Sequence, residues 1–226
     1  MAVLLASLVF WLWPRIDMAV SAAFYEAGAG FPARRAEALV WLRRGGMAAT
    51  RIAIAGLALW AVAAILRPRI LESLRPSGWL FLAGTLALGP GILVNAILKD
   101  FWGRPRPVHI GAFGGDAPYV PVWKITDYCA SNCSFVSGEA STSFWLLAFA
   151  FVVPRLWRLP VLCVVLCWSF AVSATRIAFG GHFLSDVVLS WLLTLVVILA
   201  LRRWLLSEPR RSAIDAGAKR ALSFIR

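Results

Sequence analysis

Long apolar runs alternate with short polar segments along this chain. The clearest run covers residues 78–98, carries no charged side chain, and matches the roughly 20 residues that a helix needs to cross a bilayer. Comparable runs cover residues 47–66, 137–153 and 183–206, and another ends near residue 175. The pattern therefore predicts a series of membrane-spanning helices from residue 47 onward.

The first part of the chain is less regular. Residues 2–13 are apolar but short, and they lack the basic start and the cleavage site of a signal peptide. We therefore expect a first membrane helix that runs on toward Asp17. Residues 15–46 mix charged with apolar positions, a pattern typical of a helix that lies in the membrane interface.

These segments together predict an all-α fold: an integral membrane six-helix bundle formed by a single domain over residues 1–226. A long polar loop over residues 99–136, rich in Gly and Pro, joins the third and fourth spans. Pro90 lies between two glycines within the third span and predicts a kink there. Residues 207–226 form a basic tail.

Composition agrees with a membrane protein and changes how the charge is interpreted. The chain is 61% hydrophobic, against roughly 45–50% in soluble domains. The net charge of +12 comes from arginines that flank apolar runs, where they anchor helix ends and face anionic headgroups. No nucleic-acid groove is expected, because the basic residues are not interleaved with exposed aromatics. Four tryptophans near helix ends are typical of an interfacial belt: Trp11, Trp13, Trp157 and Trp204.

The distribution of positive charge favours cytoplasmic termini for a six-span chain, because both ends of such a chain lie on one side. The four cysteines form two pairs. Cys163 and Cys167 share one face of an apolar helix and are expected to be small packing residues. Cys129 and Cys133 lie in the polar loop, where a periplasmic location would permit a disulfide, although so short a spacing constrains its geometry. No metal site is expected, since two cysteines without a nearby histidine are an incomplete ligand set.

Three polar clusters interrupt the apolar pattern. The first covers residues 99–107 after the third span, the second covers residues 137–139, and the third covers residues 176–186. Alternate membrane crossings place the loops after the third and fifth spans on the same face of the membrane. The three clusters are therefore expected to converge on one site, and several ionisable groups at one membrane face indicate function.

The residues in these clusters suit the chemistry of a phosphate. Lys99, Arg106 and Arg176 are cations that can stabilise the oxygens of a transferring phosphoryl group. Ser137 and Gly138 begin a helix and offer a hydroxyl and backbone amides to an anion.

A histidine and an aspartate complete the predicted site. His182 and Asp186 are four residues apart at the start of a helix, so their side chains point to one face. Asp186 is expected to accept a hydrogen bond from one imidazole nitrogen. The other nitrogen would then be free to act as a nucleophile.

The order of these motifs resembles the type 2 phosphatidic acid phosphatase (PAP2) superfamily. The residues that carry the resemblance are Lys99-x6-Arg106-Pro107, then Ser137-Gly138, then Arg176-x5-His182-x3-Asp186. The resemblance implies a metal-independent phosphatase that needs no cofactor and forms a phosphohistidine on His182. It also implies that the three cations, Ser137 and Gly138 hold the phosphate, with Arg104 as a further cation.

One position departs from the family pattern. The second motif usually reads Pro-Ser-Gly-His, and its histidine donates a proton to the leaving group, whereas this chain has Glu139. Three interpretations stay open: Glu139 is the proton donor, it positions the substrate, or it marks an altered activity. His109 lies outside the motifs and is interpreted as a surface residue. The remaining loop charges are expected to be solvated: Asp100, Asp116, Lys124 and Asp127.

The resemblance predicts a membrane lipid phosphate phosphatase that hydrolyses a phosphomonoester or a diphosphate. Lipid A, undecaprenyl diphosphate, phosphatidate and phosphatidylglycerophosphate are all candidate substrates, and the Ser-Gly-Glu sequence is somewhat closer to lipid A phosphatases. The alternatives are a lipid-to-lipid phosphotransferase and a catalytically impaired lipid-binding or transport protein. The near absence of lysine indicates a GC-rich bacterial genome. The expected location is the bacterial inner membrane, with the active site facing the periplasm.

Overall fold

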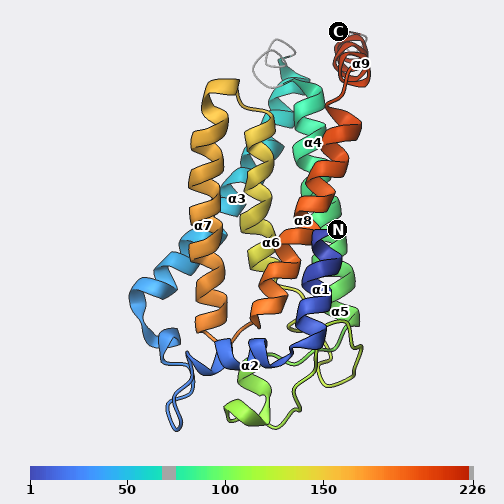
Figure 1. Ribbon diagram of the computed structural model, residues 1–226. Helices are drawn as coiled ribbons and strands as arrows, with labels where there is room; N and C mark the ends of the chain where they lie inside the picture. Colours follow the sequence, from blue (N-terminus) through green and yellow to red (C-terminus); the bar gives the residue numbers. More distant parts are fainter. Residues whose placement is uncertain (68–74, 224–226) are drawn as a thin grey trace.

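The computed structural model describes residues 1–67 and 75–223, and within these ranges it contains helices and no β-strand (Figure 1). The principal helices are α1 (Ala2–Leu12), α2 (Arg15–Ala22), α3 (Glu37–Leu66), α4 (Pro76–Leu86), α6 (Gly138–Trp145), α7 (Arg158–Ala178), α8 (Leu184–Leu205) and α9 (Arg210–Ser223). The shorter helices are η1 (Pro32–Arg35), η3 (Ala87–Leu98), α5 (Lys99–Phe101), η4 (Pro107–His109), η5 (Gly111–Phe113), η6 (Leu146–Phe151) and η7 (Arg155–Trp157). The predicted all-α class is confirmed.

Four helical segments are long and apolar enough to cross a membrane: Glu37–Leu66, Pro76–Phe101, Arg155–Ala178 and Leu184–Leu205. Helices α1 and α2 together are also long and apolar enough to cross a membrane, but they are bent by 79° relative to each other. They form a broken span or a re-entrant loop. The described chain therefore has four candidate spans, or five if the bent pair counts. The count of six stays a prediction.

Helix α3 corrects the predicted start of the second span. It begins at Glu37 rather than at residue 47, so residues 37–46 of the segment assigned to the interface belong to a helix long enough to span a membrane. Gly46 lets α3 pack closely against α7, because a Cβ at this position would lie only 2.6 Å from Val172 Cγ2. Arg43 in this first stretch of α3 consequently reaches Glu139 of α6, whereas Glu37 and Arg44 are exposed.

The third predicted span is continuous from α4 through the π-helix η3 to α5. Pro90, where a kink is predicted, lies in this π-helix, whose wider turns tolerate its missing N–H group. The kink itself stays a prediction. Asn95 Nδ2 donates a hydrogen bond of 2.6 Å to the Pro90 carbonyl. This span carries Lys99 to the end of the bundle.

The fourth predicted span is shorter than expected. Helix α6 ends at Trp145 and continues as the 3₁₀ helix η6, so it does not qualify as a candidate span. It lies inside the bundle, in contact with α3, α7 and α8. Trp145 is fully buried, and its Nε1 donates to Thr85 Oγ1 at 3.0 Å. Because its polar groups pair within the protein, α6 can carry Ser137 and Gly138 into the interior.

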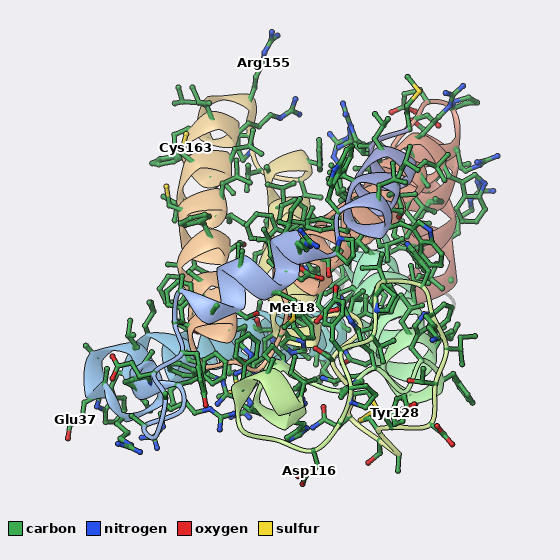
Figure 2. All side chains as sticks on the ribbon, turned by 60° about the horizontal axis from the view of Figure 1, so that its bottom comes forward. Met18, Glu37, Asp116, Tyr128, Arg155 and Cys163 are labelled. Carbon is green, nitrogen blue, oxygen red and sulfur yellow. A yellow bond between two sulfur atoms is a disulfide. The ribbon has the colours of Figure 1, made fainter. Side chains whose placement is uncertain are left out.

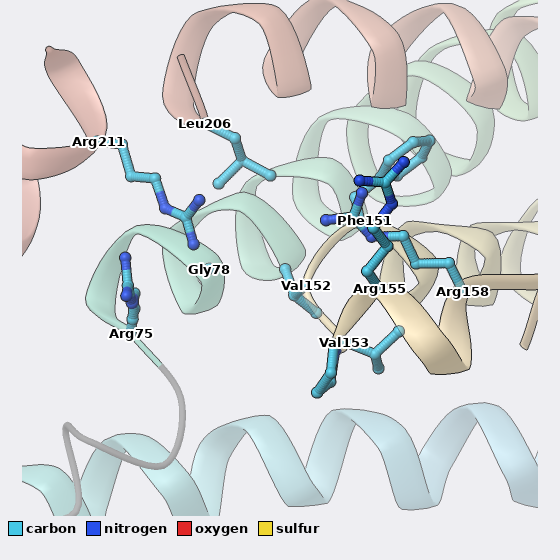
Figure 3. Close-up of a pocket in the computed structure, with 10 residues that line it drawn as sticks. Arg75, Gly78, Phe151, Val152, Val153, Arg155, Arg158, Leu206 and Arg211 are labelled. Atoms are coloured by element: carbon cyan, nitrogen blue, oxygen red, sulfur yellow. The ribbon is translucent and has the colours of Figure 1, made fainter. Parts of the chain in front are cut away.

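The end of the bundle that carries the C-terminus lies opposite the end that carries α2 and the polar loop (Figure 1). There α9 packs against α4, and the backbone N–H of Ser77 donates to Asp215 Oδ1 at 2.9 Å. A cavity of about 310 Å³ at this end is lined by four arginines, Arg75, Arg155, Arg158 and Arg211 (Figure 3). The N-terminus lies about halfway along the bundle, so a shared face for both termini stays a prediction.

The outer surface agrees with a lipid environment. All four predicted belt tryptophans are exposed. Cys163 and Cys167, which were expected to be small packing residues, are also exposed and do not pack within the protein. Their common face of α7 is the outward one. Figure 2 shows Cys163 and Arg155 toward one end of α7, away from Asp116 and Tyr128 of the polar loop.

Candidate functional site

The three polar clusters meet at the end of the bundle opposite the C-terminus. Lys99 lies where the third span ends, Ser137 caps the start of α6, and His182 lies between α7 and α8. The positive charges of Arg176, Lys99 and Arg106 all act on His182. The structure thus brings together the residues expected to converge.

His182 is held in one tautomer by a backbone carbonyl. It is 1% exposed, and its Nδ1 lies 2.7 Å from the Ser134 oxygen. A carbonyl oxygen can only accept, so Nδ1 carries the proton and Nε2 carries the free electron pair. Burial, together with Arg176 and Lys99, lowers the pKa of His182 well below its ordinary value. The neutral form of the imidazole is therefore favoured, with Nε2 unprotonated.

The predicted hydrogen bond between His182 and Asp186 is not formed. The nearest approach is 3.9 Å, between His182 Nδ1 and Asp186 Oδ2. That oxygen instead accepts from Ser134 Oγ at 2.5 Å and from the Phe183 amide at 2.9 Å. Asp186 therefore caps the first turn of α8 and fixes Ser134, whose carbonyl in turn fixes the imidazole.

Arg104 lies in the interior, where both of its ends are paired. Its Nη1 donates to Asp186 Oδ1 at 2.5 Å and its Nη2 donates to Asp17 Oδ2 at 2.8 Å, with all three side chains fully buried. Burial opposes its charge, but Asp186 and Asp17 outweigh burial and raise the pKa of Arg104. The expectation that Arg104 contacts the phosphate is therefore wrong, because its donors are already used.

Asp17 is a member of this network that the sequence did not identify. It lies on α2, and its carboxylate also accepts from the Ser185 amide at 2.8 Å and from Ser185 Oγ at 2.5 Å. The signal in the sequence was a single acid in an otherwise apolar stretch. We name Asp17, Arg104 and Asp186 the buried triad, which ties α2 to the start of α8.

The expected phosphate-binding cations are more accessible than Arg104. Arg106 donates from Nη2 to the Asn132 carbonyl at 2.7 Å, and Lys99 is partly buried. Arg176 is 5% exposed, yet its Nε has no hydrogen-bond partner among the described residues. A Cβ on Gly181 would lie 2.7 Å from Arg176 Nη2, so a larger residue here would displace the guanidinium group. Buried positive charge with free donors suits an anionic ligand.

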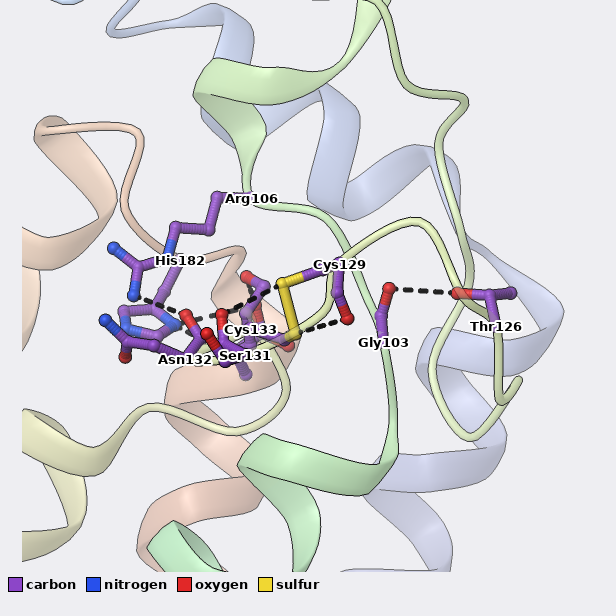
Figure 4. The surroundings of a disulfide bond; sticks show 10 residues. Gly103, Arg106, Thr126, Cys129, Ser131, Asn132, Cys133 and His182 are labelled. Carbon is purple, nitrogen blue, oxygen red and sulfur yellow. Dashed lines mark hydrogen bonds and ion pairs between the residues drawn. A yellow bond between two sulfur atoms is a disulfide. The ribbon is translucent and has the colours of Figure 1, made fainter.

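A disulfide braces the loop beside His182 (Figure 4). The sequence left the pairing of Cys129 with Cys133 open, and the structure joins them. The bridge encloses Asn132, whose carbonyl holds Arg106, and Ser134 follows directly after it. The disulfide therefore restrains the backbone that positions both a cation and the imidazole.

Glu139, at the position that departs from the family pattern, is paired with arginines. Arg43 donates to its two oxygens at 2.6 and 2.8 Å, and Arg176 Nε lies 3.6 Å from Oε1. Burial works against the charged form, but the hydrogen bonds from Arg43 and the charge of Arg176 prevail and lower the pKa of Glu139. Arg43 was missed because the sequence pattern assigned its segment to the interface. We name Glu139, Arg43 and Arg176 the open cluster.

Ser137 and Gly138 have mainly structural contacts. Ser137 is fully buried, and its Oγ accepts from the Ala140 amide at 3.3 Å as the N-cap of α6. Its own amide donates to the Asp186 carbonyl at 3.2 Å. A Cβ on Gly138 would lie 2.5 Å from Asn95 Oδ1, so this position requires glycine for close packing. The first turn of α6 still points its positive end toward the site.

The remaining predictions concern the polar loop. His109 is exposed, as are the four loop charges expected to be solvated, Asp100, Asp116, Lys124 and Asp127. Within residues 1–67 and 75–223, no group of three or more His, Cys, Asp or Glu side chains is arranged to hold a metal ion.

A helical membrane protein with a cluster of cations around a buried histidine at one end of its bundle is the class that these features define. Residues 78–210 match the PAP2 superfamily. The matched region is more than half of the chain and contains every motif named above. The chain therefore belongs to the PAP2 superfamily.

Three curated relatives, each named Lipid A 4'-phosphatase, are similar to the chain. The relative from Rhizobium leguminosarum is 47% identical over 118 residues, which cover 52% of this chain and 51% of the relative. The one from Rhizobium etli is 48% identical over 118 residues, 52% and 46% of the two chains. The one from Francisella tularensis subsp. novicida is 43% identical over 109 residues, 48% and 49% of the two chains. The chain thus spans about half the length of the curated relatives it matches. No solved structure matches the chain at a significant level.

Proposed function

We propose that this protein is a lipid phosphate phosphatase in which His182 attacks the phosphorus of a lipid phosphate. The observation that carries the proposal is the state of His182. Its Nδ1 is tied to the Ser134 carbonyl, its ring is held neutral, and three cations gather around it. Such an imidazole has a free Nε2 pair next to a place where negative charge is stabilised.

The proposed reaction has two steps. Nε2 of His182 first forms a bond to phosphorus while the bond from phosphorus to the lipid oxygen breaks, and that oxygen takes up a proton. Water then attacks the phosphohistidine, inorganic phosphate leaves, and the imidazole is restored. Lys99, Arg106 and Arg176 would stabilise the charge on the phosphoryl oxygens in both steps.

For Glu139 we favour the positioning role over that of proton donor. Its carboxyl is held in the ionised form by Arg43 and Arg176, so it has no proton to give in the resting state. The side chains of Arg43 and Glu139 are 34% and 22% exposed. Solvent at this open side of the site can therefore protonate the leaving oxygen, while Glu139 orients Arg176.

The proposed substrate is a lipid A-type phosphate. The relatives named Lipid A 4'-phosphatase share 43–48% identity with about half of the chain, and the region that matches the PAP2 superfamily contains Lys99, Arg176 and His182. The site opens next to α3, whose apolar surface would face lipid. A phosphorylated lipid can thus present its headgroup to the cations while its chains stay in the membrane.

The proposed location is the bacterial inner membrane, with the site facing the periplasm. The disulfide between Cys129 and Cys133 favours an oxidising compartment on the side of the polar loop. The arginines around the far cavity and on α9 lie at the opposite end, as expected for a cytoplasmic face.

Phosphate release by the purified protein in detergent tests the proposal. The substrates are lipid A, undecaprenyl diphosphate, phosphatidate and phosphatidylglycerophosphate, each with chelator and without added metal. We expect release from lipid A that His182→Ala abolishes. Phosphate that appears on a second lipid would instead identify a phosphotransferase. Binding of these lipids with no release from any of them would sink the phosphatase assignment.

A further inference from the structure

A second positively charged pocket adjoins the proposed phosphate site. Its volume is about 400 Å³, and it lies between η1, the first turns of α3 and the end of α7. Its lining residues are Arg34, Val40, Arg43, Arg44, Met47, Arg106, Arg176 and Phe179. Arg106 and Arg176 are shared with the phosphate site, whereas neither Lys99 nor His182 lines the pocket. The pocket therefore extends away from the nucleophile, on the far side of two of its cations.

The arginines of this pocket outnumber their partners. Of the ion pairs in the described part of the chain, those that involve these five guanidinium groups all end on Glu139. Arg34 donates from Nε to the Phe179 carbonyl at 2.7 Å, which anchors it and leaves its terminal nitrogens without a hydrogen-bond partner among the described residues. Arg44 is exposed and lies 5.1 Å from the Trp41 ring. A single phosphoryl group at His182 cannot balance this much charge on the far side of Arg106 and Arg176.

We propose that this pocket binds a second phosphate carried by the same lipid molecule whose first phosphate is hydrolysed. The inference rests on the proposed function and deepens it, because it makes the preferred substrate a bisphosphorylated lipid. Guanidinium groups bind phosphate through paired N–H donors. The converging arginines of η1 and α3 would supply these donors, while Arg106 and Arg176 would be shared between the two phosphates.

The walls of the pocket also suit a lipid headgroup. Val40, Met47 and Phe179 contribute apolar surface beside the arginines. Arg34, Arg43 and Arg44 come from η1 and the first turns of α3, at the end of a spanning helix where headgroups lie. A second phosphate on the same headgroup can therefore enter from the membrane face, together with the one that reacts.

The arginine-lined cavity at the opposite end of the bundle has no such role here. Four arginines line it, but the catalytic candidates lie at the other end of the molecule. It shows that surface arginines alone are common in this chain. The pocket beside the site is distinguished by the buried Arg176, whose Nε has no hydrogen-bond partner among the described residues.

A matched pair of substrates tests the proposal. Lipid A with phosphates at positions 1 and 4' is compared with the same lipid that carries the 4'-phosphate alone. The wild type should hydrolyse the bisphosphorylated lipid with a higher kcat/KM, about tenfold, a typical value for one charge-assisted contact. Arg44→Gln and the double variant with Arg34→Gln should lower this ratio toward one, mainly through KM. Arg51→Gln is the control, since Arg51 is exposed on α3 and does not line the pocket.

The outcomes separate the inference from the function it rests on. No release from either lipid would overturn the proposed phosphatase itself. Equal kcat/KM for the two lipids in the wild type, or an unchanged ratio in Arg44→Gln and in the double variant, would overturn the second phosphate site alone. Inorganic phosphate is the remaining arm. If it inhibits hydrolysis of the 4'-monophosphate in the wild type and not in Arg44→Gln, the pocket holds free phosphate and the substrate-borne assignment is wrong.

Discussion

The buried triad and the open cluster show two uses of ionic pairs in one protein. In the buried triad, two carboxylates enclose Arg104 and all three side chains are inaccessible to solvent. In the open cluster, one carboxylate serves two arginines and the side chains of Arg43 and Glu139 are 34% and 22% exposed. The triad has no donor to spare for a ligand, whereas the cluster keeps positive charge available. The first arrangement maintains the shape of the site, and the second can bind an anion.

The positions of the two groups fit this division. The triad joins α2 to the first turn of α8, next to the residues that hold His182. Buried charges persist only when they are paired, so the triad fixes these helices against each other. The cluster lies where α3, α6 and α7 meet. There the repulsion between arginines is relieved when an anion binds.

The largest effect on stability is expected from Arg104→Met. The change removes the cation and leaves two carboxylates buried without a partner, which typically costs about 3–5 kcal/mol. Thermal unfolding in detergent measures this loss, with Arg51→Met as the exposed control. A loss no larger than that of the control would show that the triad does not hold the fold.

Arg176→Gln should produce the opposite result. It removes a cation from the site, and we expect kcat/KM to fall about 10²–10³-fold, the range found for groups that stabilise transition-state charge. Stability should change little, because the repulsion between Arg176 and its neighbouring arginines is also removed. Enzyme kinetics and unfolding are measured on the same preparation. A strongly destabilised variant would mean that the open cluster is structural after all.

A smaller effect is expected from Asp17→Asn, which keeps the shape of the side chain but removes one charge and replaces one of its two acceptor oxygens with an amide donor. Asp17 touches Arg104 and Ser185 and none of the phosphate-site cations. It is therefore a positioning residue, and kcat should fall about tenfold with little change in KM, as for interactions made only in the transition state. A change in KM alone would contradict this role.

The pH dependence of Glu139 separates its possible roles. Its pKa is lowered, so its contribution to stability is present above its ordinary pKa, about 4.3, and is lost as the pH falls through the lower folded value. Between pH 5 and 8 the carboxylate stays ionised. Glu139→Gln should therefore lower kcat/KM by a similar factor, about three- to tenfold, across this whole range. A variant whose kcat/KM falls mainly at acidic pH, where the wild-type carboxyl gains its proton, would instead identify Glu139 as the proton donor.

The smallest effect is expected from removal of the disulfide. With Cys129→Ser and Cys133→Ser together, the loop that holds Arg106 and His182 is restrained only by its hydrogen bonds. Closing so short a loop stabilises by less than the roughly 3 kcal/mol of a 15-residue loop. We expect a modest loss of activity and a small decrease in the unfolding temperature. Substitution of the exposed Cys163 and Cys167 by Ser is the control, and an equal effect there would exclude a role of the disulfide.

Much of the site could be predicted because its proposed chemistry depends on the types of its side chains. The order of Lys99, Arg106, Arg176 and His182 predicts that they meet, since each follows or precedes an apolar run of membrane length. The contact that fixes the imidazole could not be predicted, because the acceptor is the backbone carbonyl of Ser134. A backbone acceptor leaves no trace in the pattern of residue types.

The hydrophobic pattern also led to wrong expectations for two arginines, Arg43 and Arg104. Arg43 lies in a stretch whose pattern predicts an interfacial helix, but its guanidinium group pairs with Glu139. Gly46 lets this part of α3 approach α7. Arg104 was predicted to be a further phosphate-binding cation, because nothing in the sequence shows that Asp17 of α2 pairs with it. In both cases a long-range pair determined the role of the charge.

The proposed role of His182 as the nucleophile can be tested by trapping the phosphoryl enzyme. Protein mixed with lipid A labelled with ³²P is quenched within one turnover, and the label is located by peptide mapping. We expect acid-labile, base-stable phosphate on His182. It should be absent in His182→Gln and should form faster in the wild type than in Arg176→Gln. Label on another residue, or phosphate release by His182→Gln at the rate of the wild type, would contradict it.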